Sequence, residues 1–142
     1  MSFDNVATEG VLLVDYDGNE LREAYVQRMK DEGFDVVLPA DDELLVDIDD
    51  EAQYAAFQKS WPIFERDIAL IFAYAPTYVE RPSRSGLPSR HITVRLPFEI
   101  HDPMERIAWQ GALGSDPCRE LLSAIRSTRG DIHPTLFVEA KQ

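Results

Sequence analysis

The sequence predicts an α+β fold, because strand-like and helix-like patterns alternate along its 142 residues. From residue 43 onward the order is strand, helix, strand, strand, helix, strand, which is typical of a ferredoxin-like or RRM-like βαββαβ unit. In that unit two helices cover one face of an antiparallel sheet. A shorter strand, helix, strand pattern precedes it. We therefore predict one compact domain, with an acidic β-α-β extension at residues 1–42 and a core at residues 43–142.

Three patterns define the extension. The apolar run at 11–15 predicts a strand, and apolar residues of the following segment recur near helical spacing until Gly33 stops the helix. The run 34–38 predicts a second strand, which Pro39 closes. Asp15 and Asp17 are interpreted as turn residues between the first strand and the helix.

The core elements follow from periodicity and capping signals. Residues 91–96 alternate between polar and apolar, which predicts a strand with one buried face. Asp102 and Asp116 are each followed by proline, as at a helix start, so one helical stretch is expected to break near Gly114. The predicted strands are 43–49, 68–79, 91–96 and 135–140, and the predicted helices are 51–64 and 103–127.

Charge is distributed unevenly along the chain. The formal net charge is −12, and residues 1–50 hold 15 acids and 3 bases, whereas residues 51–142 hold 11 of each. The acidic field would repel a nucleic-acid backbone, which argues against broad, salt-dependent DNA binding by this chain alone. A local basic patch stands out, since residues 81–95 contain four arginines and no acid.

Signals for compartment are few. The N-terminus lacks the basic and apolar halves of a signal peptide, and no apolar run approaches the ~20 residues that a membrane span needs. We therefore expect a cytoplasmic protein with no membrane partner. The single cysteine, Cys118, cannot form an internal disulfide and is interpreted as structural.

Acidic residues gather on one face of the predicted sheet. In a βαββαβ sheet the first and third strands are neighbours and the fourth flanks the first, so Asp47, Asp49 and Glu139 are expected beside His91. Two carboxylates at i and i+2, with a third from a neighbouring strand, suit Mg²⁺ or Mn²⁺. The sequence therefore predicts that these three acids hold a metal ion in a catalytic site.

The loop before His91 predicts a phosphate site. Its guanidinium groups, its serine hydroxyls and the backbone at Gly86 are groups that bind a triphosphate. Strand alternation places Arg90 on the opposite face from His91 unless the loop bends there. The expected nucleotide-binding residues are Arg84, Ser85, Ser89, Arg90, His91 and Arg95, with Ser83 nearby.

Three short motifs resemble those of the archaeo-eukaryotic primase superfamily, which includes the primase-polymerases. Val46-Asp47-Ile48-Asp49 is similar to its hhhDhD motif, Ser89-Arg90-His91 to its s-x-H motif, and Val138-Glu139 to its strand-ending h-D motif. The resemblance covers about residues 43–140. It implies a minimal catalytic core that is similar to a βαββαβ unit.

The resemblance also implies a function. The chain would be a nucleotidyltransferase that binds nucleoside triphosphates through two divalent ions. Asp47, Asp49 and Glu139 would hold the ions, while His91 and nearby arginines would bind the phosphates of the incoming nucleotide. A single-stranded DNA template and a replication protein are the implied partners, in phage or plasmid DNA replication.

Other functions are compatible with the same residues. The acidic charge fits a catalytically inactive interaction protein, either a nucleic-acid mimic or a decayed primase fold that binds a replication or defence protein. A metal-dependent phosphoesterase would use the same carboxylates on another substrate. The segment from Val11 to Asp17, with the helix and strand after it, resembles the opening of a response-regulator receiver domain. A receiver, however, needs a helix directly after residue 38 and a lysine in a later strand.

Ordinary structural roles also account for these residue types. Paired acids at a strand end are common as turn and cap residues, and a lone histidine after a polar loop is commonly a hydrogen-bonded surface residue. Arginines without nearby acids also serve as solubilising charges. His101 and His133 lie beside predicted caps or turns and are interpreted as structural.

Overall fold

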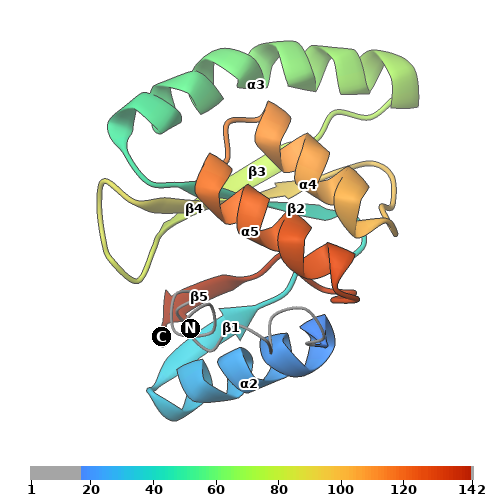
Figure 1. The fold of residues 1–142 in the computed structure, drawn as a ribbon. Coiled ribbons are helices and arrows are strands. Elements are labelled where there is room, and N and C mark those ends of the chain that lie inside the picture. Colours follow the sequence, from blue (N-terminus) through green and yellow to red (C-terminus); the bar gives the residue numbers. More distant parts are fainter. Residues whose placement is uncertain (1–16, 142) are drawn as a thin grey trace.

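The computed structural model describes residues 17–141, which form helices and two antiparallel sheets (Figure 1). The predicted α+β class is confirmed. The predicted strand at 11–15, with Asp15, lies outside the described residues. The elements are α2 (Gly18–Asp31), β1 (Phe34–Val37), β2 (Glu43–Ile48), α3 (Glu51–Phe72), β3 (Thr77–Pro82), β4 (Arg90–Arg95), α4 (Pro103–Ala112), α5 (Pro117–Thr128) and β5 (Phe137–Ala140).

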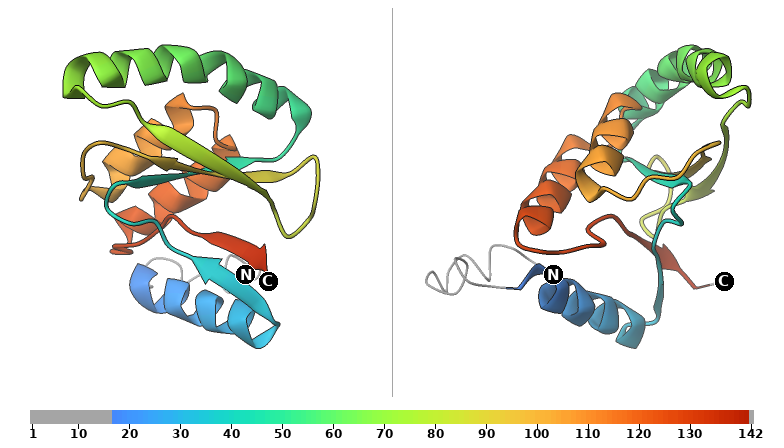
Figure 2. Two further views of the ribbon diagram at one scale, coloured as in Figure 1. Left: turned by 180° about the vertical axis from the view of Figure 1, so that it is seen from behind. Right: turned by 90° about the vertical axis from the view of Figure 1, so that its right-hand side faces the viewer.

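The larger sheet has the strand order β2-β4-β3, and all its pairs are antiparallel. The expected pairing of the first and third core strands is therefore confirmed, and it sets Asp47 opposite His91. The helices α3, α4 and α5 gather on one side of this sheet (Figure 2). The main core forms there, where Phe57 and Leu113 pack against Leu44 and Ile92.

The last strand does not join this sheet, which corrects the predicted βαββαβ topology. β5 pairs with β1 instead, with Glu139 opposite Asp35. The smaller sheet lies beside the larger one, and α2 runs along its outer side (Figures 1 and 2). A strand of the predicted extension and a strand of the predicted core thus share one sheet.

The reason is visible at the outer edge of β2, the edge that β5 was expected to occupy. The side chains of Gln110, Ser115 and Gln53 accept hydrogen bonds from the backbone N–H groups of residues 45, 47 and 49. Arg119 and Arg106 donate to the carbonyl oxygens of residues 45 and 43. Because these backbone groups already have partners, a further strand has nothing to pair with there.

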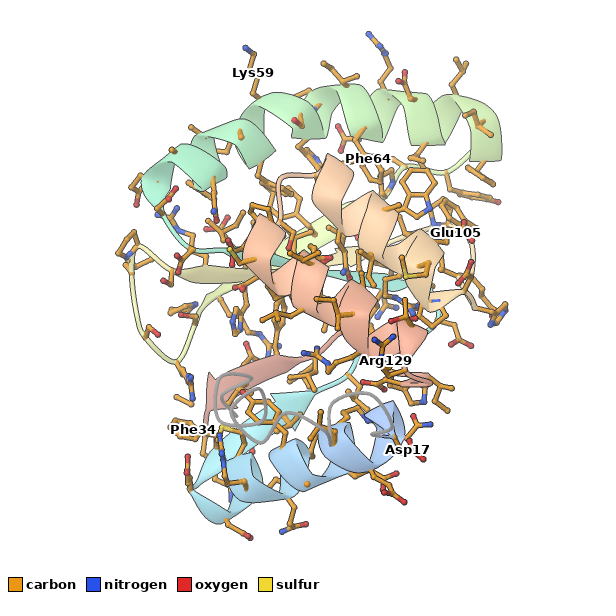
Figure 3. All side chains as sticks on the ribbon, in the orientation of Figure 1. Asp17, Phe34, Lys59, Phe64, Glu105 and Arg129 are labelled. Carbon is orange, nitrogen blue, oxygen red and sulfur yellow. The ribbon has the colours of Figure 1, made fainter. Side chains whose placement is uncertain are left out.

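The helix α3 is longer than predicted, and the predicted strand at 68–79 is wrong in its first half. Phe57, Trp61, Phe64 and Ile68 recur at helical spacing, and all but Phe64 are buried. Figure 3 shows Phe64 on the side of α3 facing α4, and Lys59 projecting away from the molecule. The helix ends at Ala73, which has a left-handed conformation with φ 68°.

The predicted break in the last helical stretch is confirmed. α4 and α5 are separated by Gly114, whose φ of 90° is one that glycine adopts without strain. Asp102 caps α4 by accepting a hydrogen bond from the backbone of Met104 at 3.0 Å. Among the described residues, no helix is both long and apolar enough to cross a membrane.

Candidate functional site

A pocket of about 380 Å³ lies where the two sheets, α2, α5 and the β3–β4 loop meet. Its volume is within the range of small-molecule sites. The strands contribute carboxylates and a histidine, the loop contributes hydroxyls and an arginine, and the helices contribute apolar and charged side chains. Of the residues predicted from the sequence, Asp47, Asp49, Ser83, Arg84, Ser85, Ser89 and His91 line it.

His91 connects the two sheets at the base of the pocket. Its Nδ1 lies 3.1 Å from Oε2 of Glu139 in β5, and its Nε2 lies 3.8 Å from Oδ1 of Asp47 in β2. The imidazole also stacks on Phe137, with ring centroids 3.8 Å apart and planes 4° apart. The structure therefore brings Asp47, His91 and Glu139 together, although Glu139 comes from the smaller sheet.

Burial controls the protonation of this group. Desolvation lowers the pKa of His91 and outweighs its hydrogen bond with the Glu139 carboxylate, which acts in the opposite direction. Desolvation also raises the pKa of Asp47, and the positive charge of Arg119 offsets this only in part. Burial thus favours the neutral imidazole of His91. It also disfavours the ionised form of the Asp47 carboxylate, because nearby positive charge does not fully offset the desolvation.

The three predicted metal ligands do not form one compact set of donor atoms. Within residues 17–141, the acidic, histidine and cysteine side chains whose ligand atoms do lie within 4.8 Å of one another are those of Asp41, Glu99 and His101. All three are exposed, and His101 Nε2 lies 3.2 Å from Glu99. This triad could hold a metal ion, and it includes a histidine that was interpreted as structural.

Arg84 is the basic residue of the loop that lines the pocket. Its guanidinium lies 5.4 Å from the centroid of the Phe34 ring, and its Nη1 is 3.7 Å from Sδ of Met29. Within the described chain, Arg84 has no carboxylate partner in ion-pair range. Its charge is therefore available to an anionic ligand. Figure 3 labels Phe34, which lies beside α2 in the lower part of the molecule.

The structure places Arg90 and Arg95 outside the pocket. The guanidinium of Arg90 lies 3.6 Å above the Tyr54 ring and 3.3 Å from Glu51 on the helix-covered side, because strand alternation continues through the start of β4. Arg95 lies at the far end of β4 and pairs with Glu43 at 3.6 Å. Neither contributes to the pocket that contains His91.

Arg119 is a pocket residue that sequence reasoning missed. It donates hydrogen bonds to the carbonyl oxygens of Leu45 and Leu136 and pairs with Glu120 at 2.5 Å. It thereby fixes β2, α5 and the start of β5 relative to one another. The available signal was helical spacing, since Arg119, Leu122 and Arg126 fall at i, i+3 and i+7 and all line the pocket.

Asp17 and Cys118 have defined positions as well. Asp17 caps α2, and its carboxylate accepts from the backbone of Asn19 at 2.8 Å, which agrees with its interpretation as a turn residue. Cys118 is exposed at the start of α5 and lines the pocket. His133 donates its backbone N–H to Asp131 at 2.9 Å and does not line the pocket.

Comparison with protein-family models, with curated proteins and with solved structures finds no match to this chain. The pocket combines carboxylates at the end of a strand, a buried histidine and Arg84, which has no carboxylate partner among residues 17–141. These groups suit a ligand that combines phosphate with a divalent cation.

Proposed function

We propose that this pocket binds a nucleoside triphosphate with divalent metal ions and transfers its nucleotidyl group to an attacking hydroxyl, with release of pyrophosphate, as the core of a primase-polymerase-like nucleotidyltransferase. One observation carries the proposal: the acidic pair, the histidine and the basic loop, which are far apart in sequence, line a single pocket. Glu139, the third acid of the motif pattern, is hydrogen-bonded to that histidine.

The acidic residues fit a divalent cation by their chemistry. Asp47 and Asp49 line the pocket, and Mg²⁺ or Mn²⁺ prefers carboxylate oxygens as ligands. Burial raises the pKa of Asp47, so a cation would stabilise its ionised form. In the proposal Asp47 and Asp49 hold the ions from within the pocket, and Glu139, the third acid of the motif pattern, acts from outside the pocket lining through its contact with His91. Bound metal ions supply positive charge that polarises a phosphate and stabilises in-line displacement.

The remaining pocket residues bind and orient the phosphates. Arg84 offers a guanidinium that lacks a carboxylate partner among residues 17–141, and charge near a transferring phosphoryl group stabilises the transition state. The serine hydroxyls of the loop add hydrogen-bonding groups. His91, which is stacked on Phe137, is held in a fixed orientation toward the acids. A template strand and a role in phage or plasmid DNA replication extend this proposal and rest on the motif resemblance alone.

The charge pattern of the β2-β4-β3 sheet favours this proposal over nucleic-acid mimicry. A mimic would present a continuous row of unpaired acids. Glu43 of this sheet lies 3.6 Å from Arg95, and Arg81 of β3 lies 3.8 Å from Glu139 of the smaller sheet. Acids near this face are therefore paired with arginines at both places. The acid-coated surface that mimicry needs is not found on this part of the described chain.

The test is calorimetric titration of the protein with ATP, with and without Mn²⁺. The native chain is expected to bind ATP only when Mn²⁺ is present, because the cation links the carboxylates to the phosphates. The Asp47→Asn/Asp49→Asn variant is expected to lose at least tenfold in affinity, and His91→Ala is expected to weaken binding as well. The matched control is Asp41→Asn/Glu99→Gln, which removes the exposed triad and should leave ATP binding unchanged.

A second readout uses the only cysteine of the chain. Because Cys118 is exposed and lines the pocket, ATP with Mn²⁺ should slow its alkylation by iodoacetamide. No binding by the folded native chain, and no protection of Cys118, would reject the proposal in favour of an interaction protein. Release of inorganic phosphate without pyrophosphate would indicate a phosphoesterase instead.

A further inference from the structure

The pocket has an apolar wall that the proposed metal and phosphate chemistry does not use. Leu21 and Tyr25 of α2 and Leu122 of α5 line this wall. All three side chains are only partly buried, and Leu122 retains 37% exposure. Partly exposed apolar side chains inside a polar pocket gain from a ligand that covers them.

The wall is built where α2 crosses the end of α5, and its position is fixed by close contacts. The backbone N–H of Gly18 donates to the carbonyl of Arg129 at 2.9 Å, and a Cβ on Gly18 would lie only 2.8 Å from the carbonyl oxygen of Arg126. Arg22 forms a buried ion pair with Asp131 in the turn after α5. Figure 3 shows Asp17, at the start of α2, close to Arg129. The apolar wall is therefore preformed.

The polar groups of the pocket lie toward its other sides. Asp47 and Asp49 are at the end of β2, and Arg84 reaches the other end of α2, where it contacts Met29. The β3–β4 loop thus spans from the large sheet to α2, and the pocket is enclosed between the loop, the strands and the two helices. The pocket thus has charged side chains on some of its sides and apolar side chains on another.

We propose that the wall formed by Leu21, Tyr25 and Leu122 is a nucleoside subsite, in which the ring of Tyr25 contacts the base. This inference rests on the proposed function, and it adds that the site recognises a nucleoside and not a polyphosphate alone. Arg28 lies 5.7 Å from the centroid of the Tyr25 ring and contributes a cation–π contact to it. Base–aromatic stacking tolerates any base, so the subsite would accept several nucleotides.

The test compares two probes, ATP and inorganic tripolyphosphate, each titrated calorimetrically with Mn²⁺. The native chain is expected to bind ATP about tenfold more tightly than tripolyphosphate, since loss of one stacking contact typically costs that much or more. Tyr25→Ala should remove this preference by weakening ATP binding alone. Tyr25→Phe keeps the ring and should retain the preference. The control is Tyr74→Ala, a tyrosine that is 73% exposed after α3 and should change neither affinity.

The outcomes separate this inference from the function on which it rests. Equal affinities of the native chain for the two probes, or a Tyr25→Ala variant that keeps the preference for ATP, would overturn the nucleoside subsite and leave the phosphate site in place. Failure of the native chain to bind either probe would overturn both. Unchanged tripolyphosphate binding by Tyr25→Ala also shows that the variant is folded.

Discussion

The two edges of the β2-β4-β3 sheet differ in how their backbone groups are satisfied. At the β2 edge, side chains from α3, α4 and the turn after α4 accept hydrogen bonds from the backbone N–H groups of residues 45, 47 and 49. At the β3 edge all six residues are exposed, and their side chains include Glu80, Arg81 and Pro82. The two edges therefore prevent a further strand from adding in different ways. Polar side chains pair with the backbone of β2, whereas β3 has charged side chains and a proline at its edge.

The β2 edge is also the part of the sheet that is joined to the candidate site. Arg119 links this edge to Leu136 just before β5, and its charge acts on Asp47. Gln110, which accepts from Leu45, donates in turn to the buried Glu120. The β3 edge has no such connection through its backbone among the described residues. Changes at the two edges should therefore have unequal consequences.

The largest effect is expected from Arg119→Met. The substitution removes the hydrogen bonds to Leu45 and Leu136 and leaves Glu120 buried without its ion-pair partner. The free energy of unfolding should fall by about 3 kcal/mol, measured by urea denaturation. The matched control is Arg95→Met, where the arginine is 66% exposed and pairs at the surface, and the loss should be below about 1 kcal/mol. Similar losses in the two variants would contradict the proposed importance of the β2 edge.

A smaller, pH-dependent effect is expected from Glu120. Burial raises its pKa above the ordinary value of 4.5, against the opposing charge of Arg119. The folded chain therefore holds this proton more tightly than the unfolded chain does. The resulting stabilisation is complete below pH 4.5 and is lost as the pH rises through the raised pKa of the folded state.

The Glu120→Gln variant isolates this contribution, because glutamine does not ionise. The free energy of unfolding of the native chain minus that of the variant should decrease with rising pH across this window. Urea denaturation at a series of pH values measures it. A difference that stays constant or increases with pH would show that Arg119 and Gln110 fully compensate the buried charge.

The smallest effect is expected at the β3 edge. Val79 is 57% exposed, so Val79→Thr should change the free energy of unfolding by less than about 0.5 kcal/mol. The matched control is Val46→Thr in β2, which places a hydroxyl at a fully buried position and should cost more than about 1 kcal/mol. Thermal denaturation of both variants checks this order. A larger loss at Val79 would mean that the exposed edge has a partner in solution.

Local patterns in the sequence were sufficient for most elements. Alternation at 91–96 and proline after Asp102 and Asp116 predicted β4 and the starts of α4 and α5 correctly, because these signals act within a few residues. The end of α3 was missed. Residues 68–72 are apolar and β-branched or aromatic in part, but Ile68 is buried at helical spacing after Phe57 and Trp61, and Phe72 stacks on Phe98 with ring centroids 4.4 Å apart.

The residues of the candidate site were also predicted in part, again where the sequence signal acts over a short range. Residues of the β2 end, the loop and His91 line one pocket because they belong to adjacent strands and their connection. In the structure Arg90 lies on the helix-covered face, over the Tyr54 ring, because successive side chains of β4 point to opposite faces. Arg119 and Tyr25 reach the pocket from helices. Helical spacing groups Arg119 with Leu122 and Arg126 on one face of α5, but how α2 and α5 pack against the sheets depends on contacts between residues far apart in the sequence.

Local sequence patterns were enough to predict the α+β class, the positions of most elements and, of the site, Asp47, Asp49, His91 and several loop residues that line the pocket. Tertiary structure alone decided that β5 pairs with β1, so that Glu139 reaches His91 from a second sheet. It also decided that α2 closes the pocket. The physical reason is that strand order depends on which backbone groups remain without partners. Here the side chains of Gln110, Ser115 and Arg119 satisfy the β2 edge from positions about seventy residues away.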